Sequence, residues 1–301
     1  MMTTPADLED FAVGFSLSEG VISSSSDIDS LDIVRLDDGV ELRMWLSKPK
    51  ADRLQERRRH IAGPMGCGLC GIDSIAEAMR PAAVIERGQQ FSSEQIMAAM
   101  QKLPLLQKLN AETRAVHAAA FWDFTGCMIA LREDVGRHNA LDKLSGALAR
   151  ASVVGNDGII LLTSRVSVEM VQKSAVIGAP LIVSVSAPTA LAVRMTDAAG
   201  ITLAAIARAD GFEVFTHPCR IHLKPLSMSP IDKCSAHGIW SREQAFEKSS
   251  GLTFLCVSTS SANRLRLGPG SSLSIRPDER HKPTTRCAVF YRAPIFARSA
   301  R

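Results

Sequence analysis

Apolar residues recur along the second part of the chain in short continuous runs that alternate with amphipathic segments. Between residues 139 and 207 these runs include GIILL, LIV and ITLAAIA. Continuous apolar runs flanked by helical patterns indicate buried strands of a parallel sheet with helices on both faces. We expect helices at 139–151, 168–177 and 189–199, and strands at 158–163, 181–186 and 201–207. This order predicts a parallel βαβαβ region of the α/β class.

The first part of the chain has a different order, which predicts an α+β arrangement. The first helix is expected to have Thr4 as its N-cap, Pro5 at its first position and Gly20 in a left-handed closing position. Apolar residues alternate on either side of Asp38-Gly39, and this predicts a β-hairpin over 31–46. The remaining expected elements are helices at 72–79 and 92–102 and strands at 115–123 and 127–134.

Charge is distributed unevenly along the 301 residues. Residues 222–301 contain 13 Lys and Arg against 5 Asp and Glu, together with 13 serines, and show no sustained apolar period. This composition predicts a mostly disordered basic tail. We therefore divide the chain into an α+β subdomain at 1–110, an α/β subdomain at 111–221 and a tail of low order at 222–301.

The composition also excludes several classes of protein. Hydrophobic residues make up 46% of the chain and charged residues 22%, as in soluble globular proteins. No apolar run approaches the roughly 18 residues of a membrane span, and the N-terminus lacks the pattern of a secretory signal. Seven scattered cysteines do not fit a disulfide framework. We therefore expect a cytoplasmic protein that has neither a membrane nor a nucleic acid as its partner.

Cys67 and Cys70 lie three residues apart among the glycines of GPMGCGLCG and are the main candidates for chemistry. A structural zinc site needs a second pair of ligands, for which Cys219 and His222 are available. A thioredoxin-like redox couple would follow a strand of a βαβ unit, whereas this loop precedes the parallel region. Two further alternatives are a buried structural pair and a mobile loop whose nucleophilic thiol carries sulfur as a persulfide.

Polar residues at two predicted helix starts form a second group of candidates. Asp134–Asn139 and Ser164–Ser167 each precede a helix, where free backbone N–H groups favour an anion such as a phosphate. Ordinary helix capping and surface pairing are the alternative for both. His117 lies within an apolar strand, and Thr216-His217-Pro218 follows a strand. For these residues a functional role and a purely structural role both remain open.

Six sequence blocks carry a resemblance to a known family. They are TTPADLEDFAVGFSLSEGVI, GCGLCG, HAAAFWD, REDVGRHNALDKLSGAL, SRVSVEMVQKSAVIGAPLIVSVSAPTALAV and FTHPCRI. In order and spacing these blocks, which run from residue 3 to about residue 221, resemble the formate dehydrogenase accessory sulfurtransferase family (FdhD). The resemblance implies a fold like that of cytidine deaminases and a homodimer.

The same resemblance implies a function. Members of the family take sulfur from a cysteine desulfurase as a persulfide and insert it into the bis-guanine-dinucleotide molybdenum cofactor, which makes formate dehydrogenase competent. The resemblance implies that Cys67 carries the persulfide and that Cys70 is an assisting thiol. Arg137 and His138 are further candidates for phosphate or guanine contacts, and no permanently bound metal is expected. The family's cofactor-contacting segment falls in register on Ile206, Ala207, Arg208, Ala209, Asp210 and Gly211, of which only Arg208 matches the family's basic position.

Other classes of function make different demands on the sequence. A non-catalytic carrier or chaperone would bind the molybdenum cofactor and dock formate dehydrogenase without moving sulfur. A zinc-stabilised structural protein would need four ligands, for which Cys67, Cys70, Cys219 and His222 are the candidates. A zinc deaminase is excluded, because no His is followed two positions later by Glu and because Gly66 precedes Cys67 where that motif has Pro.

The resemblance also implies strands ahead of residue 3 and a family boundary near Ile221. Without those strands, we expect the first sheet to have an unpaired apolar edge. We also expect the tail after Ile221 to be foreign to the family. A chain altered at both ends in this way is expected to have impaired activity.

Overall fold

The computed structural model describes residues 2–37, 39–46, 80–222 and 289–292. Residues 1–222 and 289–301 form one compact unit, whereas the second unit, residues 223–288, lies outside the described residues. The helix expected at 72–79 and most of the tail expected to be disordered also lie outside them. Among the described residues, no helix is long and apolar enough to cross a membrane.

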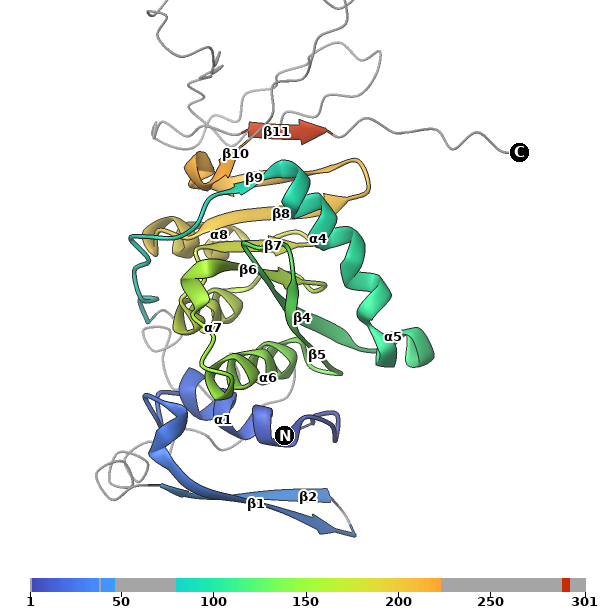
Figure 1. Cartoon of the computed structure of the whole chain (residues 1–301), viewed down its shortest axis with the longest axis vertical. Helices are drawn as coiled ribbons and strands as arrows, with labels where there is room; N and C mark the ends of the chain where they lie inside the picture. The colour runs from blue at the N-terminus through green and yellow to red at the C-terminus, as the bar shows by residue number, and fades with distance from the viewer. Residues whose placement is uncertain (1, 38, 47–79, 223–288, 293–301) are drawn as a thin grey trace, which may run out of the picture. The chain divides into compact units, whose positions relative to one another are not determined.

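A seven-stranded mixed sheet forms the centre of the first unit (Figure 1). The strand order is β11-β9-β8-β7-β6-β4-β5. Strands β6, β7 and β8 are parallel, and β4 and β9 are antiparallel to their neighbours. The bounds are β4 (His117–Asp123), β5 (Met128–Asp134), β6 (Gly158–Leu162), β7 (Leu181–Ser184), β8 (Thr202–Arg208), β9 (Gly211–Thr216) and β11 (Val289–Arg292).

Helices cover both faces of this sheet (Figure 1). On one face α6 (Arg137–Arg150), α7 (Val168–Ile177) and α8 (Ala190–Ala198) share a buried apolar cluster with β4, β6, β7 and β8. On the other face α4 (Ser93–Leu106) contacts β6 and leads into α5 (Lys108–Thr113). All of β6 is buried, as a strand between two helical layers must be. The predicted βαβαβ region is confirmed by β6-α7-β7-α8-β8, while the likeness to cytidine deaminases stays a prediction.

Two smaller sheets accompany the central one. Strands β1 (Ile28–Leu36) and β2 (Gly39–Leu46) pair antiparallel, which confirms the predicted hairpin. Strand β3 (Phe91–Ser92) pairs in parallel with β10 (Ile221–His222). Three short 3₁₀ turns, at Ser25–Asp27, Gly155–Asp157 and Pro218–Arg220, complete the described part of the chain.

Among the described residues after His222, the one element of secondary structure is β11. It pairs antiparallel with β9, with Tyr291 opposite Phe212. The composition of residues 222–301 predicts a mostly disordered tail, and a strand of four residues is compatible with that prediction. Strand β11 supplies hydrogen-bond partners to the edge of β9, which would otherwise present unpaired backbone groups.

Helix α1 (Leu8–Ser18) begins later than predicted. Thr4 is not its cap, because the Thr4 hydroxyl accepts the amide of Val135 at 3.1 Å instead. The Thr4 amide also donates a hydrogen bond to Asp134 Oδ2 at 2.9 Å. Asp7 occupies the N-cap position at φ 52° and makes no side-chain capping bond. A tertiary hydrogen bond thus overrides the local capping preference of Thr4. The end of the helix is as predicted, since Gly20 is left-handed at φ 64°.

Helices α1 and α6 cross with their backbones in contact at two glycines. A Cβ on Gly14 would lie 1.7 Å from the carbonyl oxygen of Asp142, and a Cβ on Gly146 would lie 1.9 Å from that of Asp10. No side chain fits at either position. The side chain of Asp10 reinforces the crossing, because its Oδ1 lies 2.6 Å from Nη1 of Arg150 on α6. This contact holds α1 against the helix that begins at the sheet edge described below.

We expect Gly14→Ala to lower the free energy of unfolding by about 3 kcal/mol, because the new methyl group must push the two helices apart. Gly39→Ala is the matched control, since a Cβ there meets no atom within 4 Å. Urea denaturation followed by circular dichroism measures both. A Gly14→Ala variant with wild-type stability would contradict the close crossing.

Candidate functional site

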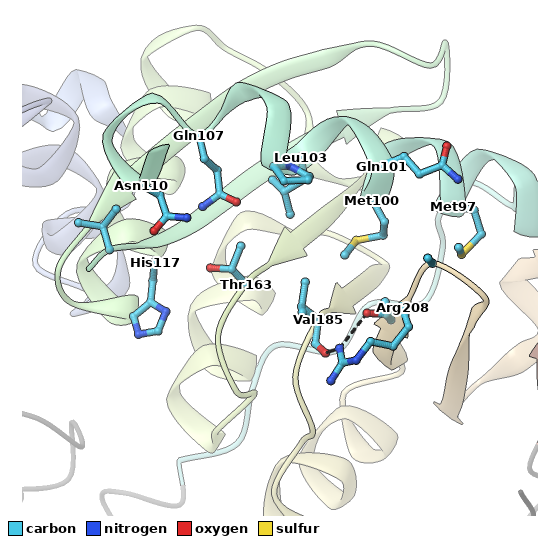
Figure 2. Close-up of a pocket in the computed structure, with 14 residues that line it drawn as sticks. Met97, Met100, Gln101, Leu103, Gln107, Asn110, His117, Thr163, Val185 and Arg208 are labelled. Atoms are coloured by element: carbon cyan, nitrogen blue, oxygen red, sulfur yellow. Dashed lines mark hydrogen bonds between the residues drawn. The ribbon is translucent and has the colours of Figure 1, made fainter. Parts of the chain in front are cut away.

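A cavity of about 510 Å³ opens at the carboxyl ends of the parallel strands (Figure 2). Thr163 follows β6, Val185 follows β7 and Arg208 ends β8. His117 reaches the cavity from the first position of β4, because β4 runs antiparallel to β6 and so begins at this edge. Ligands of open α/β sheets bind beyond this end of the strands. The lining residues are Met97, Met100, Gln101, Leu103, Pro104, Gln107, Asn110, Val116, His117, Thr163, Val185, Ala207, Arg208 and Ala209.

Helices α4 and α5 supply the wall opposite the strand ends (Figure 2). Met97, Met100 and Leu103 give this wall an apolar surface, and Gln101 and Asn110 add amide groups. A mostly apolar lining with a few polar groups is typical of small-molecule sites. The wall therefore suits a ligand with both apolar and hydrogen-bonding parts.

Sequence reasoning missed this wall. It predicted a helix over 92–102, whereas α4 runs from Ser93 to Leu106 with Pro104 inside it. The available signal was the apolar period, which continues past residue 102 to the fully buried Leu103. That signal predicts a longer helix, but it does not predict that the helix borders a cavity.

The segment Ile206–Gly211 forms the end of β8, the turn and the first residue of β9. Ile206 is left-handed at φ 54°, which is a strained conformation for a β-branched residue. The pairing of β8 with β9 shifts register at the same point. Of the six residues in the segment, Ala207, Arg208 and Ala209 line the cavity.

The guanidinium of Arg208 joins the ends of two parallel strands (Figure 2). Its Nη1 donates to the carbonyl oxygen of Val185 and, at 2.9 Å, to that of Ala207. Among the described residues, its Nε and Nη2 have no hydrogen-bond partner. Arg208 is thus held in place through one nitrogen while its other donors remain open to an anion at the cavity.

Hydroxyl groups hold the loops that follow β6 and β7. The Ser184 hydroxyl donates to the carbonyl of Ser164 at 2.7 Å and accepts the amide of Ser186 at 3.1 Å. The Thr163 hydroxyl accepts the amide of Ala118 at 2.8 Å and so links β6 to β4. Ser164, which the sequence placed in a candidate anion cluster, therefore has a structural contact. These bonds fix the rim of the cavity before any ligand enters.

A buried ion pair holds the start of α6. Asp134 Oδ2 lies 2.6 Å from Lys143 Nζ, and both side chains are completely buried. Asp134 also accepts hydrogen bonds from the Thr3 hydroxyl at 2.7 Å and the Gly136 amide at 2.8 Å. Burial alone would raise the pKa of Asp134, but the hydrogen bonds from Lys143, Thr3 and Gly136 outweigh it and lower the pKa. Part of the cluster at Asp134–Asn139 is thus a structural network.

His117, Arg137 and His138 come together at the same edge. Burial lowers the pKa of His117, and the nearby charges of Arg137 and His138 lower it further. His138 Nε2 lies 2.7 Å from Glu169 Oε2 on α7. Near neutral pH the His117 imidazole is therefore uncharged, and it borders the cavity that Arg208 also lines.

Thr216-His217-Pro218 lies at the opposite end of β9 from this cavity. The Thr216 hydroxyl donates to the carbonyl of Ile201 at 2.7 Å and accepts the amide of Leu203 at 3.0 Å. The structural reading of this motif, as the end of a strand, accounts for these contacts.

Cys67 and Cys70 lie outside the described residues. Cys127 and Cys219 are the free cysteines of the described part, and both are exposed. Within the described ranges, no group of three or more His, Cys, Asp or Glu residues is placed to hold a metal ion. His222, a candidate zinc ligand together with Cys219, has its Nε2 2.6 Å from Gln90 Oε1.

We expect Asp134→Asn to lower the free energy of unfolding by about 3 kcal/mol at pH 7, because it leaves Lys143 buried without its counter-charge. The pKa of Asp134 is lowered in the folded protein, so its stabilisation is present above about pH 4 and is lost as the pH falls through the lowered value. The difference between the variant and the wild type should therefore shrink in acid. Urea denaturation at pH 7 and in acid measures it. Glu41→Gln, which removes the exposed pair with Arg43, is the control and should leave the midpoint unchanged.

Comparison with known proteins supplies an independent finding. The chain is 50% identical over 224 residues to "Sulfur carrier protein FdhD" of Agrobacterium fabrum, a match that covers 74% of this chain and 83% of the relative. It is also 50% identical over 222 residues to the protein of the same name from Brucella abortus, covering 73% of this chain and 82% of the relative.

A solved structure agrees with these relatives. It is described as that of a candidate formate dehydrogenase accessory protein from Desulfotalea psychrophila, and it matches with a TM-score of 0.57 and 26% identity over 73% of this chain and 82% of that one. The model of the FdhD/NarQ family matches residues 1–222, which contain every cavity-lining residue given above. The chain therefore belongs to the FdhD/NarQ family.

Proposed function

We propose that this protein is a sulfurtransferase that serves formate dehydrogenase. Its Cys67 takes sulfur as a persulfide from a cysteine desulfurase and passes it to the bis-guanine-dinucleotide molybdenum cofactor. The observation that carries the proposal is the 50% identity to a relative named Sulfur carrier protein FdhD. The FdhD/NarQ match over residues 1–222 supports it, since that range includes the GCGLCG loop. The cytoplasmic location and the homodimer belong to the same proposal.

The loading step needs no outside oxidant. The Cys67 thiolate attacks the outer sulfur of the desulfurase persulfide, a new S–S bond forms at Cys67, and the desulfurase cysteine leaves as a thiolate. In discharge the S–S bond breaks and its electron pair returns to Cys67, while the acceptor supplies the electron pair of its new bond to sulfur. Cys70 assists as a neighbouring thiol.

The cavity is the proposed site of one guanosine and pyrophosphate part of the acceptor, which as a whole is larger than the cavity. Its volume of about 510 Å³ lies within the usual range of small-molecule sites. Arg208 offers open donors for a phosphate, and α4 offers an apolar wall for part of a ring system. The acceptor is the substrate here, and the chain's own contribution is to bind and orient it.

The sulfur-carrying role is tested by loading the protein. Incubation with a cysteine desulfurase and cysteine should add about 32 Da, one sulfur atom, to the peptide that contains Cys67. Cys67→Ala should abolish the adduct, whereas Cys127→Ala, which removes an exposed cysteine elsewhere, should keep it. Mass spectrometry of the digested protein measures the adduct. Retained cofactor binding without any adduct would favour the non-catalytic carrier over the sulfurtransferase.

The acceptor site is tested separately with a fragment of the cofactor. Di(guanosine-5′) pyrophosphate (GppG) contains the guanosine and pyrophosphate groups of that cofactor. We expect Arg208→Gln to weaken GppG binding about tenfold, because a charge-assisted hydrogen bond is lost. Arg35→Gln, on the exposed hairpin, should bind as the wild type does. Isothermal titration calorimetry measures the affinity, and sulfur loading at Cys67 should be unchanged in both variants.

A further inference from the structure

The imidazole of His117 is the one titratable side chain of the described lining whose charge changes near neutral pH. Figure 2 shows its ring at one end of the cavity, with Thr163 and Val185 between it and Arg208. Among the described residues, the ring has no hydrogen-bond partner. An unpaired imidazole at the border of a cavity is available to a ligand.

The acidic groups near His117 are engaged elsewhere. Asp134 lies opposite His117 in the β4–β5 register, but its carboxylate is paired with Lys143. Glu133 on β5 accepts the amides of Leu109 and Asn110, at 2.8 and 2.9 Å.

One further carboxylate stands close by, on α7. Glu169 has its Oε2 2.7 Å from His138 Nε2, so it too has a partner of its own.

Basic side chains and open donors also lie at the starts of α6 and α7 and at the end of β8. Arg137 and His138 on α6 are close enough to lower the pKa of His117, and Arg208 on β8 lines the cavity. Neither α6 nor α7 has a side-chain cap at its N-terminus. Arg137 Nε and the hydroxyl of Ser167 are buried and have no hydrogen-bond partner within the described part of the chain. These cationic groups, helix N-termini and unpaired donors disfavour a positive charge on His117 when the cavity is empty. They favour the binding of an anion in the cavity.

We propose that His117 binds the acceptor's pyrophosphate and takes up a proton from solvent as it does so, then donating a hydrogen bond to a phosphate oxygen. The inference rests on the proposed function, because that function places a pyrophosphate in this cavity. The bound dianion offsets the charges of Arg137 and Arg208, so the imidazolium that was disfavoured in the empty cavity becomes favoured. One proton moves from solvent to the imidazole, and no electrons are transferred.

Linkage turns this proton uptake into a measurable pH dependence. A ligand that raises the proton affinity of His117 must itself bind more tightly when His117 is protonated. GppG affinity should therefore rise about tenfold as the pH falls from about 8 to about 5.5, if the ligand moves the pKa by about one unit. The pyrophosphate diester of GppG keeps its charge throughout this range, so the dependence belongs to the protein.

The experiment is calorimetric titration of the full-length chain with GppG at several pH values. At one neutral pH, two buffers of different ionisation enthalpy report the protons taken up on binding. His117→Gln should reduce the pH dependence to less than about twofold and abolish the proton uptake. His222→Gln, a substitution away from the cavity, should leave both as in the wild type.

Two results of this titration would overturn the inference: a wild-type affinity that does not change with pH, or a dependence that survives in His117→Gln. In the second case, loss of the dependence in His138→Gln would assign it to His138. Sulfur loading of Cys67 is measured on the same preparations, so that failure of the sulfur-carrying role can be distinguished from failure of this inference.

If GppG binds at no pH, the cavity is not the acceptor site, and sulfate becomes the probe. An NMR titration should then show that sulfate raises the pKa of His117, and an unchanged pKa would overturn the inference.

Discussion

The shared direction of β6, β7 and β8 is the constraint on which the rest of this structure depends. Parallel strands end at a common edge, so the crossover helices that return the chain must begin there. That edge collects helix N-termini, whose free N–H groups give it a positive character. The antiparallel strand β4 starts where its neighbour ends, which brings His117 to the same place as Thr163. One topological rule thus assembles a cavity from residues distant in sequence.

Local patterns predicted the elements of this fold where the deciding forces are local. Helix α7 occupies Val168–Ile177 as expected, because an apolar stripe and a following glycine define both of its ends. The start of α1 could not be predicted in the same way. Thr4 has the chemistry of a cap, but its hydroxyl accepts the amide of Val135, 131 residues further along the chain. A prediction from neighbouring residues cannot include a contact between residues so far apart in the sequence.

The candidate site was predictable in part, for a related reason. Arg208 was identified through the register of a family segment, and the structure independently places it at the cavity. His117 was left open, since a histidine in an apolar strand is equally consistent with packing, and only the position of β4 decides what it borders. Met97 and Gln101 were missed because an amphipathic period shows which face of a helix is buried, but not what that face encloses. Cys67 and Cys70 lie outside the described residues and remain as predicted from sequence.

The backbone of Ile206 has a consequence for how this protein would respond to engineering. Its φ of 54° is one that glycine or asparagine adopts at lower energy. A library screened only for heat resistance would therefore enrich those replacements at this position. Because these residues favour the same φ, the replacements would keep the bend that precedes Arg208 and its carbonyl partners. Heat resistance could therefore be raised at this peptide unit while Arg208 keeps its position.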